Sequence, residues 1–174
     1  MNHEDPVETE VKLRIPTTEG WGPRLESLGY RLAIPAQSER SVLWDRGTEL
    51  LDQGCALRLR RYAGSAVLTW KGPKREDPML KVRPERETAL ADAEAMEGIL
   101  RALGYVPVLS MEKVRALWKR EDLVACLDET PFGCFLELEG NEAAIQRGMS
   151  ELGVGPERAE QRSYPTLYRE HGLA

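Results

Sequence analysis

The sequence is poor in the features that mark secreted and zinc-binding proteins. It has only three cysteines, Cys55, Cys126 and Cys134, and no two of them have Cys-x-x-Cys spacing. An odd number of cysteines without such spacing fits reduced thiols better than a disulfide framework, and it argues against a zinc site. Both histidines, His3 and His171, lie near the ends of the sequence, so we expect them at the surface rather than in catalysis.

Long apolar runs and an excess of positive charge are also missing. No uncharged apolar stretch approaches the roughly 20 residues that a membrane-spanning helix needs. The first residues, with Glu4 and Asp5, lack the cationic and then apolar order of a signal peptide. The formal net charge is -5, whereas a protein that binds duplex nucleic acid normally carries a basic surface. These absences predict a cytoplasmic protein that binds neither a membrane nor duplex nucleic acid.

The length and the apolar content are those of one compact domain. At 174 residues with 41% hydrophobic content, the chain can bury a substantial core but has little room for a second one. We therefore interpret residues 1–174 as a single domain.

Charged and apolar residues alternate along residues 7–15. Glu8, Glu10, Lys12 and Arg14 occupy the even positions, and valine, threonine, leucine and isoleucine occupy the odd ones. This predicts a β-strand with one charged and one apolar face. Alternation is ordinary for a single strand with its charges in water, but here it recurs in at least five later segments. If these strands close into a barrel, the charged rows face a shared lumen and the apolar rows face outward under helices.

Further strand and helix signals follow along the chain. Strand patterns cover residues 30–34, 41–45, 55–62, 66–71, 79–87, 112–118, 123–128 and 135–140. A connection is expected over residues 35–39, and polar loops over residues 46–54 and 74–78. Helices are expected over residues 17–28, 92–103 and 141–152 and after Ser163, because each of the first three begins at a capping residue and is followed by glycine.

The charged face residues of these strands form a cationic and an acidic set. We expect the cationic set to bind substrate: Lys12, Arg58, Arg60, Lys71, Lys81, Arg83, Lys113 and Arg115. We expect the acidic set to hold a metal ion: Glu8, Glu10, Glu85, Glu87, Asp128, Glu137 and Glu139. A purely structural charge network inside a barrel would cost roughly several kcal/mol of desolvation per ion and gain little over an apolar filling. A ligand site explains it better, because cations hold an anionic chain and carboxylates hold Mg²⁺ or Mn²⁺, as in phosphoryl transfer.

The motifs of these strands resemble those of one known family. The run Glu8-Thr9-Glu10-Val11-Lys12 resembles the Glu-x-Glu-x-Lys signature of the CYTH group, or triphosphate tunnel metalloenzymes, which includes class IV adenylyl cyclases and thiamine triphosphatases. Later motifs resemble the family in order: Leu57-Arg58-Leu59-Arg60, Thr69-Trp70-Lys71-Gly72, residues 83–87, Glu112-Lys113-Val114-Arg115, Leu127-Asp128 and residues 133–139. The resemblance covers residues 7–164.

The resemblance implies an α+β fold in which an antiparallel eight-stranded β-barrel, the triphosphate tunnel, is flanked by α-helices. The residues expected to take part in catalysis are Glu8, Glu10, Lys12, Glu137 and Glu139, with Mg²⁺ or Mn²⁺ as the cofactor. Cys126 departs from the pattern, since some triphosphatases of the family have a metal-binding carboxylate there. The segment Ser163-Tyr164-Pro165 lacks a lysine that other members carry.

Three functions are consistent with these residues. The first is metal-dependent hydrolysis of a linear triphosphate, in the form of inorganic tripolyphosphate, a nucleoside triphosphate or thiamine triphosphate. The second is adenylyl cyclase activity, in which the ribose 3′-hydroxyl replaces water as the nucleophile. The third is a non-catalytic triphosphate or polyphosphate sensor, which the many carboxylates make less favourable. The partner is a small-molecule triphosphate in each case, and the protein is expected to be a monomer or a homodimer.

Overall fold

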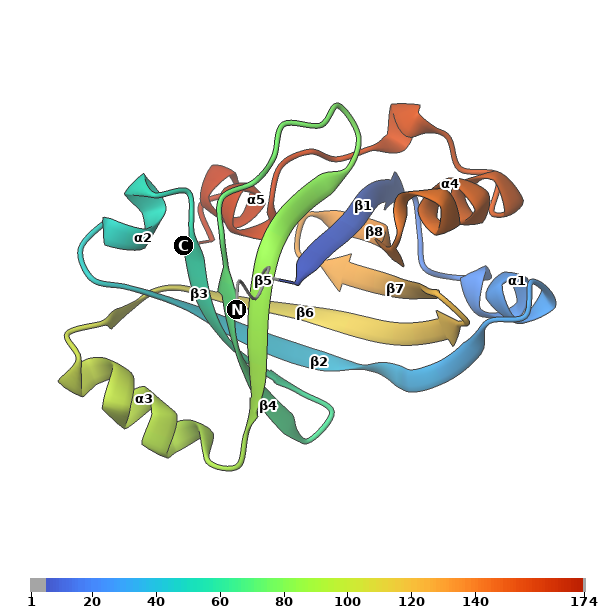
Figure 1. The fold of residues 1–174 in the computed structure, drawn as a ribbon. Helices are drawn as coiled ribbons and strands as arrows, with labels where there is room; N and C mark the ends of the chain where they lie inside the picture. Colours follow the sequence, from blue (N-terminus) through green and yellow to red (C-terminus); the bar gives the residue numbers. More distant parts are fainter. Residues whose placement is uncertain (1–5, 174) are drawn as a thin grey trace.

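Eight antiparallel strands close into a barrel, as the resemblance of the strand motifs implies (Figure 1). The structure is a computed structural model that describes residues 6–173. The strands neighbour one another in the order β1-β5-β4-β3-β2-β6-β7-β8. Their bounds are β1 Val7–Ile15, β2 Arg31–Asp45, β3 Ala56–Tyr62, β4 Ser65–Lys71, β5 Lys81–Leu90, β6 Val106–Arg120, β7 Leu123–Thr130 and β8 Gly133–Gly140.

Five helices within residues 6–173 lie around the barrel, and three of them pack on its apolar outer rows. The five helices are α1 Trp21–Ser27, α2 Glu49–Asp52, α3 Ala93–Ala102, α4 Glu142–Glu151 and α5 Tyr164–Glu170, with a short 3-10 turn at Pro156–Arg158. The largest apolar cluster joins the outward residues of β1, β7 and β8 to α1 and α4. A second cluster lies under α3, and a third joins α5 to β2 and β6. No helix within residues 6–173 is long and apolar enough to cross a membrane.

Strand β2 is longer than the sequence pattern predicts. Residues 35–39, expected to form a connection, belong to this strand, and Gln37, Ser38 and Glu39 pair with β6. The register shifts between Leu32 and Ile34, between Ile34 and Gln37, and between Leu43 and Trp44. Pro35 lies within the second shift, where a residue without an N–H group does not interrupt a regular ladder. The proline therefore marks a bulge and not the end of a strand.

Two other expectations for local structure are wrong. The first helix begins at Trp21, after Gly20 at φ 79°, and neither expected threonine caps it. Thr17 instead accepts a hydrogen bond from the N–H of Glu19 at 3.1 Å. The segment 46–54, expected to be a loop, contains α2. The caps expected at Asp92 and Asn141 are confirmed, since each side chain accepts a hydrogen bond from an N–H in the first turn of its helix, and Ser163 caps α5 in the same way.

Close packing of α4 on the barrel can be tested at Gly148. A methyl group there would approach Leu123 Cδ2, a buried atom of β7, to 2.5 Å. We expect Gly148→Ala to lower the free energy of unfolding by about 1–3 kcal/mol, the usual effect of overpacking. Gly98→Ala on α3 is the matched control, because nothing lies within 4 Å of the added carbon, and it should be neutral or stabilising. Urea denaturation of both variants decides the point; equal effects would contradict this packing.

Candidate active site in the barrel lumen

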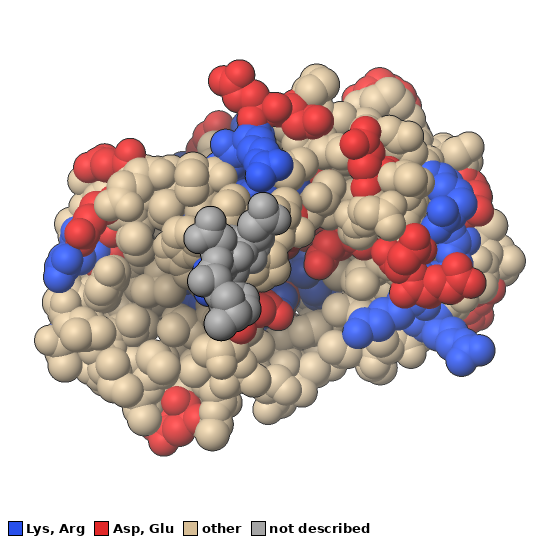
Figure 2. All heavy atoms as spheres, viewed as in Figure 1, with Lys and Arg blue, Asp and Glu red and all other residues tan. Residues whose placement is uncertain are grey.

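The charged rows of the strands face the inside of the barrel. Lys12 on β1 and Asp128 on β7 are almost fully buried, and so are Arg115 on β6 and Glu137 on β8. Their chain neighbours Val11, Leu127 and Leu138 belong to the apolar cluster outside the barrel wall. Figure 2 shows a face that is hollowed near its centre, with Lys, Arg, Asp and Glu side chains inside the hollow. The predicted charged lumen is therefore present.

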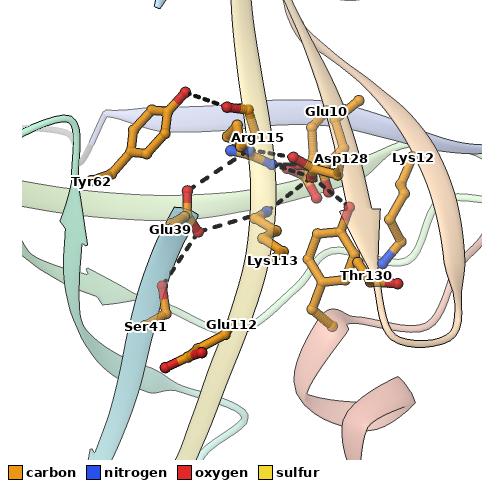
Figure 3. Close-up of polar contacts among 12 residues, drawn as sticks. Glu10, Lys12, Glu39, Ser41, Tyr62, Glu112, Lys113, Arg115, Asp128 and Thr130 are labelled. Carbon is orange, nitrogen blue, oxygen red and sulfur yellow. Dashed lines mark hydrogen bonds and ion pairs between the residues drawn. The ribbon is translucent and has the colours of Figure 1, made fainter. Parts of the chain in front are cut away.

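Arg115 is the centre of the most deeply buried charge cluster (Figure 3). Its Nε donates to Asp128 Oδ1 at 2.6 Å, and its Nη2 donates to Asp128 Oδ2 at 2.5 Å and also to Glu137. Lys113 Nζ and Tyr164 Oη donate to the same Asp128 oxygen at 2.9 and 2.6 Å. Burial alone would raise the pKa of Glu137, but Arg115 and Lys113 outweigh it and hold that pKa below its usual range. These charges neutralise one another within the protein.

Glu39 on β2 belongs to the same cluster, although the sequence pattern predicts a connection at this position. It is 3% exposed, and its carboxylate lies 3.7 Å from Lys113 Nζ and 3.8 Å from Arg115 Nε. Ser41 Oγ donates to it at 3.4 Å. Burial favours the neutral acid, but Lys113 and Arg115 together lower the pKa of Glu39 to about 2. The sequence contains a signal for this position. Glu39 lies two residues before Ser41, so in a strand that extends beyond the expected residues 41–45 the two side chains point to the same face.

A second group of ion pairs joins β1, β4 and β5. Lys71 Nζ lies 2.5 Å from both Glu8 Oε2 and Glu85 Oε2. Lys81 Nζ donates to Glu10 at 3.1 Å. Burial and a hydrogen bond with the carboxyl group of Glu85 raise the pKa of Glu8, against the attraction of Lys71. The sequence predicted that these residues share a lumen, and the register of β1 with β5 brings them together.

Lys12 lies in an unusual environment for a lysine. Its side chain is 1% exposed, its Nζ donates to the backbone carbonyl of Arg162 at 2.5 Å, and it lies 4.1 Å from the centre of the Tyr164 ring. Burial, followed by repulsion from Lys81, lowers the pKa of Lys12 from 10.5 to about 7. A lysine with such a pKa exchanges its proton near neutrality, which is the property that acid–base catalysis needs.

Glu139 is an expected site carboxylate that forms no ion pair with any described residue. It lies directly opposite Glu10 in the pairing of β8 with β1, and it is open to solvent. No ion pair or hydrogen bond within residues 6–173 holds its side chain. Partial desolvation inside the barrel wall, with repulsion from Glu8 and Glu10, raises the pKa of Glu139. Negative charge is therefore in excess where these three residues meet.

A divalent cation fits the chemistry of this acidic group. Carboxylate oxygens are the ligands that Mg²⁺ and Mn²⁺ prefer, and a cation would relieve the repulsion among Glu8, Glu10 and Glu139. Within residues 6–173, however, no three Asp, Glu, His or Cys side chains converge in a preformed metal-binding geometry. The donor set thus suits the expected metal, while its side chains have to reorient to bind it.

Two expected phosphate ligands, Arg58 and Arg60 on β3, also lack partners. No hydrogen bond or ion pair among the described residues holds either guanidinium group, and Arg58 Nε is buried without an acceptor. Burial, with repulsion from Arg58, lowers the pKa of Arg60. Buried donors are almost always satisfied in proteins. These two arginines are therefore available for an anion.

A cavity of about 270 Å³ opens beside Arg58. Of the eight expected cations, Arg58, Lys71, Arg83 and Lys113 line it. Lys74, which the sequence pattern predicts in a solvated loop, also lines the cavity. Lys74 was missed because the loop around it has no periodic pattern.

Three expectations for individual residues are modified by the structure. Arg83 Nε donates to the Gly72 carbonyl at 2.8 Å, so this guanidinium group also holds the loop between β4 and β5. Glu87 is exposed on β5 and makes no ion pair with any described residue. Cys126 is buried beside the Arg115 cluster, and burial raises the pKa of its thiol to about 12. It is therefore a neutral side chain at a position where some triphosphatases of the family have a carboxylate. All three cysteines are free.

A closed antiparallel barrel with paired and unpaired charges along its lumen defines a charged-tunnel protein. Residues 7–164 match the CYTH domain, and the chain belongs to the CYTH domain family. This confirms the resemblance carried by the strand motifs.

Similar proteins support the same assignment. The chain is 34% identical over 137 residues to the "putative adenylate cyclase" of Methanocaldococcus jannaschii, and the match covers 76% of each protein. An X-ray structure of a protein of the same description from Vibrio parahaemolyticus has a TM-score of 0.82 at 20% identity, covering 95% of this chain and 99% of that one. A Hippeastrum protein has a TM-score of 0.71 at 21% identity, covering 94% and 96%. At these identities the two solved structures show a common fold.

The two glutamates of β8 should respond differently to substitution. Glu137→Gln removes a partner of the buried Arg115, so we expect the free energy of unfolding to fall by about 3–5 kcal/mol. Glu139→Gln removes a repulsive charge and should leave the Tm unchanged or higher. Because Gln matches Glu in size, packing does not confound the comparison. Thermal denaturation of both variants tests it, and a loss of stability in Glu139→Gln would contradict the assignment of excess negative charge.

The low pKa of Lys12 should make stability depend on pH in a defined direction. Between about pH 7 and the ordinary value of 10.5, the unfolded chain holds a proton that the folded chain has released. The Lys12 contribution to the free energy of unfolding therefore rises with pH across this window. Lys12→Met removes the contribution, so its stability relative to wild type should be greatest below about pH 7 and decline towards about pH 10. Urea denaturation across this range is the test, and a difference that does not vary with pH would contradict it.

Proposed function

We propose that the protein is a divalent-metal-dependent hydrolase of a linear triphosphate group. The observation that carries the proposal is the buried, unpartnered Nε of Arg58 beside the unpaired Arg60, at the edge of the cavity. Arg58 and Arg60 lie on one strand face, about 7 Å apart along the strand axis, so their two guanidinium groups can bind one phosphate chain through charge-assisted hydrogen bonds. No carboxylate among the described residues forms a hydrogen bond or ion pair with the guanidinium group of Arg58 or Arg60, so an anionic ligand would supply the missing hydrogen-bond acceptors.

The acidic group of the lumen supports hydrolysis over simple binding. Mg²⁺ or Mn²⁺ held by Glu8, Glu10 and Glu139 would neutralise the phosphates and lower the pKa of a bound water. Arg58, Arg60 and Lys113 would orient the phosphate chain, and Lys12 would exchange a proton near neutral pH. A sensor of polyphosphate would bind more tightly without the repulsion of the unpaired Glu139, which makes that alternative less favourable.

Adenylyl cyclase activity is the second candidate. The Methanocaldococcus jannaschii relative is named a putative adenylate cyclase. The Hippeastrum protein is also described as a putative adenylyl cyclase, with a dominant triphosphatase activity. One tunnel serves both reactions, because the nucleophile is water in one and the ribose 3′-hydroxyl in the other. The triphosphatase activity of the Hippeastrum protein favours hydrolysis as the leading candidate for this chain.

A panel of triphosphates with Mg²⁺ or Mn²⁺ tests the proposal. Release of phosphate from tripolyphosphate, nucleoside triphosphates or thiamine triphosphate supports a hydrolase. Formation of cyclic AMP and pyrophosphate from ATP supports a cyclase, and binding without release supports a sensor. Excess EDTA should abolish turnover, because the carboxylates then repel the substrate. Full activity in EDTA would contradict a metal-dependent mechanism.

Substitution of Arg58 tests its role in substrate binding. Arg58→Ala removes charge-assisted contacts of about 1.5–3 kcal/mol, so KM should rise by roughly tenfold or more. Arg61→Ala is the matched control on the same strand, since Arg61 points to the outer face and pairs with Glu97 of α3 at 2.8 Å. KM of this control should stay within about twofold of wild type. An unchanged KM in Arg58→Ala would contradict the assignment of the phosphate site.

A further inference from the structure

The first residue of α5, Tyr164, reaches into the lumen from outside the barrel strands. The side chain of Ser163 accepts a hydrogen bond from the N–H of Thr166 and so fixes where this helix begins. Tyr164 Oη donates to Asp128 Oδ2 at 2.6 Å, and its ring packs edge-on against Phe135, with the ring centres 5.5 Å apart. A side chain that belongs to none of the eight strands therefore contributes to the charged lumen.

The Tyr164 ring contacts two of the lysines that are expected to bind phosphate. Lys12 Nζ on β1 lies 4.1 Å from the ring centre, and Lys113 Nζ on β6 lies 4.2 Å from it. An ammonium group within about 6 Å of an aromatic face is attracted by the negative charge of that face, most strongly away from water. Two ammonium groups repel each other, so one ring beside both offsets part of the repulsion. The ring thus fixes both lysines around one point of the lumen.

Lys12 depends on the ring more than Lys113 does. Lys113 also pairs with Asp128 at 2.9 Å, whereas Lys12 forms no ion pair with any described residue although it is only 1% exposed. Its Nζ donates instead to the backbone carbonyl of Arg162 at 2.5 Å. A buried ammonium group without a polar or charged partner is costly. For Lys12, the ring of Tyr164 and this carbonyl take the place of a carboxylate partner.

The chain just before α5 holds the ring and the carbonyl in place. The N–H of Glu160 donates to the backbone carbonyl of Lys12 at 2.7 Å, so this segment lies against β1. The carboxylate of Glu160 accepts hydrogen bonds from Arg162 Nε at 2.8 Å and from Arg14 Nε at 2.9 Å. The contacts to Lys12 are therefore formed before any substrate binds, and little further ordering is needed.

We propose that Tyr164 is a positioning residue for triphosphate hydrolysis, and that its ring holds the ammonium groups of Lys12 and Lys113 where they meet the phosphates. The hydrogen bond to Asp128 fixes the orientation of the ring. The inference rests on the proposed function and adds a residue of α5 to a site otherwise built from strands. The competing explanation is that Tyr164 only attaches α5 to the barrel. Substitutions that separate the ring, the hydroxyl group and the packing distinguish the two.

The first measurement compares two substitutions of Tyr164 in steady-state kinetics with a triphosphate and Mg²⁺ or Mn²⁺. Tyr164→Leu removes the ring but keeps an apolar side chain. We expect kcat to fall by about thirtyfold or more and KM to change less, since misplaced groups cost up to about a hundredfold in rate. Tyr164→Phe keeps the ring, so its kcat should stay within about fivefold of wild type. Equal losses in both variants, or an unchanged kcat in Tyr164→Leu, would overturn the inference.

Phe132→Leu is the matched control for the attachment of α5. The ring of Phe132 packs against Tyr168 of this helix, with 5.2 Å between the ring centres, and it has no cation–π contact with any described lysine or arginine. The substitution should lower the Tm, as Tyr164→Leu does, but kcat should stay within about threefold of wild type, because Lys12 and Lys113 keep the Tyr164 ring. A fall in kcat equal to that of Tyr164→Leu would assign Tyr164 to attachment alone and overturn the inference.

Acetylation of the native protein by acetic anhydride tests the two lysines without turnover. Mass spectrometry gives the rate at each lysine, and the exposed Lys119 on β6 serves as the internal reference. Relative to it, Lys12 and Lys113 should react about fivefold faster or more in Tyr164→Leu than in wild type, the scale of one cation–π contact, and Tyr164→Phe should resemble wild type. Equal rates in all three proteins would overturn the inference. No turnover of any triphosphate by the wild type would overturn the proposed hydrolase, whereas the acetylation rates would still decide whether the ring holds the two lysines.

Discussion

The ion pairs of Arg115 are the constraint on which the rest of the barrel depends. A guanidinium group enclosed by protein has to be neutralised within hydrogen-bond distance, because an unpaired buried charge costs far more free energy than a pair. Asp128 and Glu137 meet this requirement, and in doing so they connect β6, β7 and β8. With charge inside, the apolar rows face outward and the hydrophobic core lies between the barrel wall and helices α1 and α4. The helices are thus part of the core.

The charged residues of the lumen form two groups: some pair with one another, and others lack a partner that a ligand could supply. Arg115, Asp128 and Glu137 satisfy one another, whereas Arg58 and Glu139 have no such partners among the described residues. The first group fixes the shape of the barrel wall. The second leaves positive and negative charge uncompensated at separate places, which an anion and a cation together would neutralise. A ligand that brings both therefore stabilises the folded state through binding linkage.

Strand periodicity carried most of the information in the sequence. It predicted all of β1 and the hairpins β3–β4 and β7–β8, because side-chain alternation and burial have the same period of two. It failed at Pro35, where a bulge allows the strand to continue past a residue that has no N–H group. It also failed at α2, where the first turn is held by the carboxylate of Asp45, which lies five and six residues before the N–H groups that it binds. Parity placed the charged residues in the lumen. It did not reveal which of them pair, since pairing depends on register between strands distant in sequence.

Strand β1 has a consequence for how the protein is made. Its first half pairs with β5 and its second half pairs with β8, so the first strand to leave the ribosome waits for the last before it has all its backbone partners. Until then it exposes an unpaired edge and a row of apolar side chains, the features that promote intermolecular pairing. Such distant pairing also slows folding. Translation that stops before Gly133 would therefore release a chain whose barrel cannot close, and its natural fates are chaperone binding and aggregation.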